Sequence, residues 1–340
     1  MIDILSADLP ELKNIVKELG EKAFRASQLY RWLHVSMADS YDEMNNLPAS
    51  FREKLKEEAP LLRPSIETFQ VSKEDGTRKY LFKMADGNFV ESVFMRYHHG
   101  NTVCVSSQVG CRMGCRFCAS TIGGLTRNLS AGEILGQIEQ IGKHTGERIS
   151  NVVVMGTGEP LDNYDNLIRF IKMLTDENGL NISQRNVTVS TCGLVPKIRK
   201  LADEGLQISL ALSLHAPNDE KRREIMPIAN RYSLSEIMPA MDYYFEKTGR
   251  RLTFEYSLIK DVNDSEAIAR ELGNLLKGKN ALVNLIPVNP VRENDFKETD
   301  RASTEAFKKK LEKNGLHVTI RREMGRDIDG ACGQLRKRYI

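Results

Sequence analysis

The sequence C-R-M-G-C-R-F-C, residues 111–118, is the stretch that decides the fold, because it places three thiols at C-x3-C-x2-C spacing. A structural zinc ion takes about four ligands, and a 4Fe-4S cluster normally takes four cysteines. Cys111, Cys115 and Cys118 therefore leave one ligand position for another molecule. Gly110 and Gly114 allow the backbone to pass close to an inorganic core.

The spacing resembles that of the radical S-adenosylmethionine (SAM) superfamily, in which three cysteines bind a 4Fe-4S cluster and SAM chelates the remaining iron. The alternative is a zinc knuckle that takes a histidine as its fourth ligand. His98 and His99 are near in sequence, but no further C-x2-C pair and no H-x3-H pair accompany them.

Length and composition indicate an ordinary globular protein with room for one large and one small domain. The chain has 340 residues, 41% of them hydrophobic and 28% charged. It shows no secretory signal and no run of about 18 apolar residues. We therefore expect a cytoplasmic protein without a membrane segment. Six cysteines then favour metal or redox chemistry over a disulfide framework.

Basic residues are clustered although the net charge is only +3. Clusters occur at residues 250–251, 308–310, 321–326 and 336–338, and around the cysteine loop. Each cluster alone is typical of a solvated surface, but together they favour a polyanionic substrate.

The first part of the chain predicts a small helical module over residues 1–65 and a strand-rich linker over 66–97. Apolar residues recur at helical spacing within 11–20, 23–33 and 50–60. Strand patterns follow at 78–84 and 88–97, and the second places Glu91 among apolar neighbours on one face. A glutamate of an edge strand that reaches solvent is the simpler interpretation of Glu91.

Residues 98–340 predict a parallel α/β domain. Apolar runs at 102–106, 151–155, 186–190, 208–213, 252–258 and 281–286 are each followed by a helical stretch, and another strand is expected at 317–321. Capping boxes at Ser130–Glu133 and Ser233–Glu236 mark two helix starts. Six units are too few for a closed eight-stranded barrel, so we expect a six-stranded (βα)6 partial barrel with its site at the C-terminal strand ends.

The motifs lie at those strand ends. Gly158 and Glu159 follow the second strand, where the carboxylate can bind an ammonium group. The later strands end at Ser190, at Ser213-Leu214-His215 and at Asn289, whose polar groups can bind ribose, carboxylate or adenine. His215 can equally be a histidine satisfied by the backbone, and Asn289 an ordinary turn residue before proline.

Three further cysteines have simple interpretations from pattern alone. Cys104 is expected to be a buried strand thiol, and Cys332 a loop thiol among small residues. Cys192 is assigned no role.

Five runs closely resemble the RlmN family of radical SAM 23S rRNA adenine C2-methyltransferases. They are S-S-Q-V-G-C-R-M-G-C-R-F-C-A-S, M-G-T-G-E-P-L-D-N, L-S-L-H-A-P-N, N-L-I-P-V-N-P and D-I-D-G-A-C-G-Q-L. The resemblance covers about residues 88–338. The related Cfr family methylates C8 of the same adenosine. Val109, Pro160 and the run S-T-C-G at 190–193 favour the C2 family.

The resemblance implies the cofactors and the roles of the site residues. Two SAM molecules would be used per turnover, with the 4Fe-4S cluster on Cys111, Cys115 and Cys118. One SAM methylates Cys332, and a deoxyadenosyl radical made from the other abstracts hydrogen from that S-methyl group. The resulting radical adds to C2, Glu91 accepts the C2 proton, and the Cys104 thiol resolves the adduct by forming a disulfide with Cys332. Gly158, Glu159, Ser190, Ser213, Leu214, His215 and Asn289 would bind SAM.

The expected partners are 23S rRNA, a tRNA whose adenosine lies next to the anticodon, and a flavodoxin-type electron donor, with the chain acting as a monomer. Two alternatives of other kinds remain open. One is a radical SAM enzyme acting on a small molecule or peptide, and the other is a zinc-containing RNA-binding module.

Overall fold

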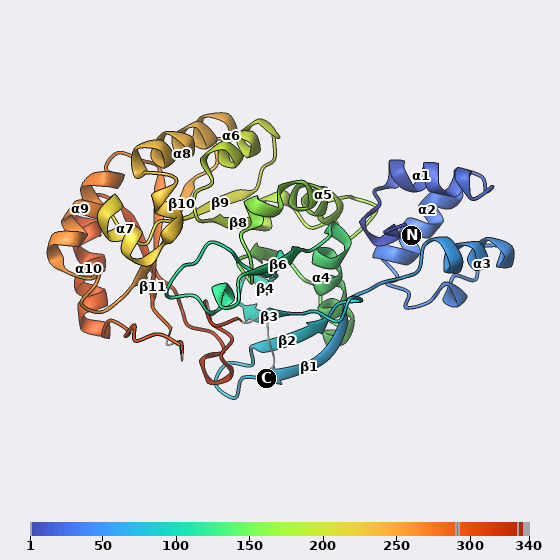
Figure 1. Ribbon diagram of the computed structural model, residues 1–340, viewed down its shortest axis with the longest axis horizontal. Coiled ribbons are helices and arrows are strands. Elements are labelled where there is room, and N and C mark those ends of the chain that lie inside the picture. The colour runs from blue at the N-terminus through green and yellow to red at the C-terminus, as the bar shows by residue number, and fades with distance from the viewer. Residues whose placement is uncertain (1, 290, 292, 332, 336–340) are drawn as a thin grey trace.

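The computed structural model describes residues 2–289, 291, 293–331 and 333–335, and three helices form a separate module at its beginning (Figure 1). They are α1 (Leu9–Glu18), α2 (Arg25–His34) and α3 (Ala49–Glu58). Their apolar faces form a core of their own around Leu12, Leu29 and Phe51, each fully buried. The helices expected from apolar spacing are therefore present.

The rest of the molecule is built around a ten-stranded sheet, in the order β1-β2-β3-β4-β7-β8-β9-β10-β11-β12. Its strands are β1 (Ser65–Val71), β2 (Arg78–Lys83), β3 (Phe89–Tyr97), β4 (Gly100–Cys104), β7 (Asn151–Val154), β8 (Val187–Thr191), β9 (Ser209–Ser213), β10 (Leu252–Leu258), β11 (Ala281–Pro287) and β12 (His317–Ile320). A separate hairpin of β5 (Gln108–Gly110) and β6 (Leu125–Asn128) brackets the cysteine loop.

The parallel part of this sheet confirms the predicted fold class. Strands β4 and β7 to β11 pair in parallel as the six expected strands, and β12 adds a seventh beside β11. Residues 66–97 contribute antiparallel β1, β2 and β3 to the same sheet instead of connecting two separate bodies. The sequence pattern does not predict β1, whose residues are mostly exposed.

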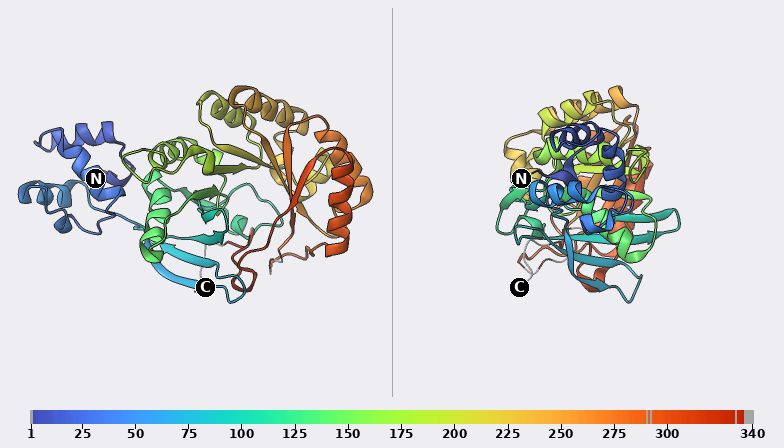
Figure 2. Two further views of the ribbon diagram at one scale, coloured as in Figure 1. Left: turned by 180° about the vertical axis from the view of Figure 1, so that it is seen from behind. Right: turned by 90° about the vertical axis from the view of Figure 1, so that its right-hand side faces the viewer.

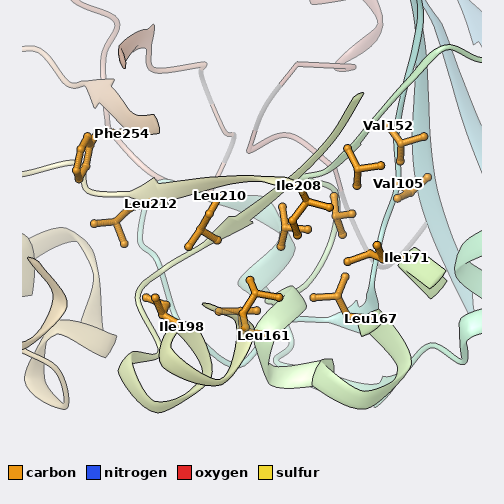
Figure 3. Packing of buried hydrophobic residues seen from close by; sticks show 14 of the residues in the cluster. Val105, Val152, Leu161, Leu167, Ile171, Ile198, Ile208, Leu210, Leu212 and Phe254 are labelled. Carbon is orange, nitrogen blue, oxygen red and sulfur yellow. The ribbon is translucent and has the colours of Figure 1, made fainter. Parts of the chain in front are cut away.

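Helices cover the outer face of the parallel strands, as Figures 1 and 2 show. They are α4 (Ala131–Thr145), α5 (Tyr164–Leu174), α6 (Val195–Asp203), α8 (Leu234–Thr248), α9 (Glu266–Leu276) and α10 (Arg301–Lys313), and the short α7 (Asp219–Ile225) lies at the strand ends. Branched residues such as Val152, Ile208 and Leu210 pack against Leu167 and Ile171 of α5 (Figure 3). Parallel strands buried in this way explain the continuous apolar runs in the sequence.

Both predicted capping boxes start helices. Ser130 Oγ accepts a hydrogen bond from the N–H of Glu133, whose carboxylate accepts one from the N–H of Ser130, at 3.2 and 2.9 Å. Ser233 and Glu236 form the same reciprocal arrangement at the start of α8. These bonds satisfy backbone donors that a helix start leaves free.

The helical module is attached to α4 by a buried ionic network. Glu139 of α4 bonds His34 Nδ1 at 2.8 Å and Arg63 Nη1 at 2.6 Å. Burial alone would raise the pKa of Glu139, but the two basic neighbours lower it below its usual value. Gly132 permits the close contact, since a Cβ there would lie 2.7 Å from the backbone of Leu5.

Candidate active site

The cysteine loop follows β5, where Gly110 has a positive φ of 78° and turns the chain toward the C-terminal ends of the parallel strands. Backbone hydrogen bonds hold this loop to distant segments. The N–H of Arg116 donates to the carbonyl of Ile225 in α7 at 2.9 Å, and that of Ala119 donates to the carbonyl of Gly333 at 2.7 Å. The loop is therefore fixed between α7 and the C-terminal segment.

The protein around the thiols disfavours their negative charge. Burial raises the pKa of the Cys111 thiol to about 12 and also raises that of Cys115. Only a strongly cationic partner would keep such thiols ionised. An iron–sulfur core supplies that charge, so the donor set fits the cluster expected from the sequence.

A single-ion zinc centre fits these residues less well. Among the residues that the structure describes, no three His, Cys, Asp or Glu side chains are grouped so that one metal ion could be held. A cluster places one cysteine on each of three irons, so its thiols need not converge on one point.

One cleft brings most of the expected site residues together. Cys111, Cys115, Cys118, Gly158, Glu159, Ser190, Ser213, His215 and Asn289 all line it. Leu214 does not, because its side chain is fully buried in the main core. Its carbonyl accepts a hydrogen bond from Arg222, and its N–H donates to the carbonyl of Glu255. The role of Leu214 in binding SAM stays a prediction.

Glu159 lies in the cleft with its carboxylate held by the backbone. Its oxygens accept hydrogen bonds from the N–H of Leu161 at 3.1 Å and of Cys192 at 2.8 Å. Burial raises the pKa of Glu159 above its usual value. Gly158 has φ +115°, and a Cβ there would lie 2.7 Å from Gln108 Cβ, so glycine is required for this close approach. A cationic group such as an ammonium would stabilise the carboxylate.

His215 and the two serines form the polar wall of the cleft. The Nδ1 atom of His215 accepts a hydrogen bond from the N–H of Ser257 at 2.9 Å, which leaves Nε2 as the protonated nitrogen. Burial and the nearby Arg222 lower the pKa of His215 to about 3, so the ring is neutral. A hydrogen bond to the backbone, the simpler interpretation of His215 from the sequence, is therefore present at Nδ1. Ser190 and Ser213 share a hydrogen bond of 3.2 Å between their hydroxyls.

A second cavity adjoins this cleft and contains Cys104. Met155, Ile286, Asn289 and Arg321 line both spaces. Cys104 is only 5% exposed and packs with Val93, Met95, Met324 and Leu335. Its thiol is thus buried, as its strand position predicts, but it faces a cavity next to the cysteine cleft.

Cys332 lies outside the described residues, yet its neighbours in the chain border both spaces. Ala331 lines the cavity of Cys104, and Gly333 lines the cleft of the cluster cysteines. The carbonyl of Gly333 accepts a hydrogen bond from the N–H of Ala119, next to the last cysteine of the loop.

Glu91 does not reach solvent, so the simpler interpretation from the sequence is wrong. β3 is an inner strand, Glu91 is 3% exposed, and its Oε1 lies 3.4 Å from Nζ of Lys79 on β2. It is two residues from Val93, the strand partner of Cys104, so it shares the sheet face of that thiol.

Two cleft residues, and one residue buried near the cleft, were not identified from the sequence. Cys192 lines the cleft beside the cluster cysteines. Glu255 on β10 also lines it; burial raises its pKa, and Asn284 donates a hydrogen bond to its carboxylate at 2.9 Å. Arg222 of α7 is fully buried behind the cysteine loop. Only the position of Glu255 inside a predicted strand offered a signal.

Several residues of the basic clusters are paired with carboxylates. Arg112 pairs with Asp162, Arg127 with Glu133 and Asp86, Lys310 with Glu266, and Arg326 with Glu298 and Glu323. Arg116 and Arg322 are exposed, and within the described residues neither forms an ion pair. These two guanidinium groups are therefore available to a polyanion. Residues 336–340 lie outside the described part.

Known proteins match the whole chain. The model of the radical SAM superfamily matches residues 105–272, and that of the ribosomal RNA large subunit methyltransferase N-terminal domain matches residues 2–61. A probable dual-specificity RNA methyltransferase RlmN of Lachnospira eligens is 62% identical over 100% of this chain and 97% of its own length. The protein of the same name from Clostridium perfringens is 54% identical over 100% of this chain and 98% of its own.

A solved structure agrees with the fold and with the placement of the module. The crystal structure of a radical SAM methyltransferase from Sphaerobacter thermophilus has a TM-score of 0.95 and 42% identity, covering 99% of this chain and 100% of that one. Among the helices of the described residues, none is long and apolar enough to span a membrane.

Proposed function

The chain belongs to the RlmN family of radical SAM methyltransferases, and we propose from this that it methylates C2 of an adenosine in the peptidyl-transferase centre of 23S rRNA. We propose a tRNA adenosine next to the anticodon as its second substrate, because the relatives are named dual-specificity RNA methyltransferases. The structural observation that supports the two-thiol reaction is the cavity of Cys104, which adjoins the cleft of the three cluster cysteines.

The residues of the cleft suit a cluster with SAM beside it. Cys111, Cys115 and Cys118 would hold the cluster, and Glu159, which lines the same cleft, would bind the ammonium group of SAM. Ser190, Ser213, His215 and Asn289 offer polar groups for the rest of that molecule. When bound, the cluster and SAM supply the radical chemistry that an electron-poor adenine carbon requires.

The two remaining thiols have separate roles in the proposal. Cys332 carries the methyl group to the RNA and becomes covalently joined to C2 through that carbon. The Cys104 thiolate would then attack the sulfur of Cys332, so that an S–S bond forms while the bond between sulfur and carbon breaks. The electron pair of that bond stays with the carbon, which takes up a proton, and methylated RNA leaves. Two electrons from a flavodoxin-type donor return the disulfide to thiols. The cavity that adjoins the cleft keeps Cys104 near this chemistry and away from solvent.

Glu91 is the proposed acceptor of the C2 proton. Nζ of Lys79 lies 3.4 Å from its carboxylate and provides a hydrogen-bonding partner for the group that would take up the proton. Burial on the Cys104 face of the sheet keeps this pair dry, which strengthens the interaction.

The expected result in cells is loss of 2-methyladenosine from 23S rRNA when the gene is deleted and its return on complementation. Mass spectrometry of nuclease-digested rRNA, with tRNA analysed in parallel, measures this. Complementation with the Cys111→Ala variant is the matched control and should restore nothing. Recovery of 8-methyladenosine would instead indicate the Cfr-type reaction, and unchanged rRNA and tRNA would contradict an RNA substrate.

The affinity for RNA should fall as the salt concentration rises, because contacts to phosphates release counterions. A plot of the logarithm of affinity against the logarithm of salt concentration should be a straight line. Arg322→Gln should lower the slope by about 1, the contribution of one phosphate contact. Arg270→Gln is the control, since Arg270 is 67% exposed on α9, at the outside of the barrel, and should leave the slope unchanged. Affinity that does not depend on salt would favour a small-molecule substrate.

We also propose that the helical module of residues 1–65 contributes RNA contacts and that the protein works as a monomer in the cytoplasm. The match of residues 2–61 to the ribosomal RNA methyltransferase N-terminal domain supports the first point.

A further inference from the structure

Arg222 in α7 is the largest side chain in the described residues that is fully buried. Its Nε donates a hydrogen bond to the carbonyl of Leu214 at 3.2 Å, and its Nη2 donates to the carbonyls of Cys192 at 2.6 Å and Ser213 at 3.4 Å. Its Nη1 has no hydrogen-bond partner in the described part of the chain. One donor nitrogen of a buried cation is thus left for something other than these protein atoms.

The charge of Arg222 is also not balanced by a carboxylate. Within the described residues it forms no ion pair, and the nearby Asp219 acts on it only electrostatically while accepting a hydrogen bond from the N–H of Leu234. Burial lowers the pKa of Arg222, but a guanidinium stays protonated in proteins. A buried, unpaired charge is costly, and natural proteins place an opposite charge beside it.

The cysteine loop supplies the missing neighbour. Cys192, whose carbonyl accepts the hydrogen bond from Arg222, packs in one buried cluster with Cys111 and Cys115, and Cys115 is an expected cluster ligand. The two segments are in contact, because the N–H of Arg116 donates to the carbonyl of Ile225, three residues after Arg222. The positive charge of Arg222 therefore lies behind the loop that would hold the cluster.

We propose that Arg222 is the buried counter-charge of the iron–sulfur cluster and raises its reduction potential, with Nη1 as a hydrogen-bond donor to the cluster or its Cys115 ligand. The proposal rests on the proposed function only in requiring that the cluster is bound. One-electron reduction by a low-potential donor breaks no bond and adds one negative charge. A fixed positive charge nearby stabilises that added charge, since charge and hydrogen bonds to sulfur set such potentials.

The alternative is that Arg222 only ties the ends of β8 and β9 together through its carbonyl partners. Two substitutions separate these roles. Arg222→Gln keeps amide donors for the carbonyls but removes the charge. Arg222→Lys keeps the charge but loses the planar fork that reaches several carbonyls. If Arg222 acts as a counter-charge, the reduction potential changes in Arg222→Gln and is retained in Arg222→Lys. If Arg222 only connects the ends of β8 and β9, removing its charge does not shift the potential.

The test is the midpoint potential of the reconstituted full-length protein, measured without SAM by redox titration and electron paramagnetic resonance. Arg222→Gln should lower the equilibrium constant for reduction at least tenfold, which is about 59 mV for a one-electron couple. Arg116→Gln removes the same charge from an exposed position in the cysteine loop and should shift the potential much less, because solvent screens it. Equal potentials in the wild type and Arg222→Gln would overturn the proposal.

A second measurement applies even if the glutamine variant does not assemble. Wild-type protein labelled with ¹⁵N only in the guanidino groups of arginine should show a nitrogen hyperfine coupling to the reduced cluster. The coupling should be missing in Arg222→Lys. If the wild type lacks it, no guanidinium contacts the cluster and the proposal fails. A wild type that binds no iron at all would instead contradict the proposed function, so the two failures are distinct.

Discussion

Cys111→Ala, Cys115→Ala and Cys118→Ala are each expected to remove the iron–sulfur cluster and to reduce both methyl transfers to the background level. The three thiols provide all the protein ligands of the proposed cluster, and the cleft that they line also holds Glu159 and the SAM-binding candidates. Loss of one thiolate exposes an iron in a site whose burial disfavours charge. Iron and sulfide assays after anaerobic reconstitution, together with the release of 5′-deoxyadenosine, measure the effect.

Cys192→Ser is the matched control for these variants. Cys192 lines the same cleft and is buried beside the cluster cysteines, but it lies outside the C-x3-C-x2-C spacing. The control variant should therefore bind a full complement of iron. Iron loss in Cys192→Ser would make this residue a ligand, and a colourless, zinc-containing wild type would favour the zinc alternative. Full activity in an iron-free variant would refute the radical reaction.

The part of the site that could be predicted is the part fixed by local pattern. Three cysteines within residues 111–118 have a spacing that few ligand sets share. Glu159, Ser190 and Ser213 could be placed together because the C-terminal ends of parallel strands lie on one side of a sheet. The strand pattern needed for that argument was clear, since buried parallel strands are apolar on both faces.

The part that could not be predicted depends on burial of charge. Arg222 lies in D-E-K-R-R-E-I, which is typical of an exposed helix, and Lys79 lies in a strand that could equally be an edge. Both are buried because of how other segments pack: the cysteine loop contacts α7 near Arg222, and β2, which holds Lys79, is an inner strand between β1 and β3. The spacing of apolar residues along one helix or strand does not show which of its charged residues other segments will bury.

Cys104→Ala should trap the protein on its RNA. The methyl group on Cys332 would still form and add to the adenine, because Cys104 is not needed for either step in the proposed reaction. The variant has no thiol at position 104, in the cavity that Val93 and Met95 also line, so the bond between Cys332 and the base would persist. A nuclease-sensitive species of reduced mobility on a denaturing gel is the expected result, and turnover should fall below one methylated RNA per protein.

Two controls show whether this trap depends on the two thiols. The Cys104→Ala, Cys332→Ala double variant should give no adduct, because it has no methyl carrier. Val103→Ala removes a fully buried side chain from the same strand, but this side chain faces the main core on the opposite side of the sheet. It should cost about 1–3 kcal/mol of stability through the cavity that it leaves, without trapping RNA.

Normal turnover by Cys104→Ala would mean that Cys104 only packs the strand. An adduct in the double variant would show that another residue joins the RNA, so only the expected pair of results assigns the carrier to Cys332 and the resolving thiol to Cys104.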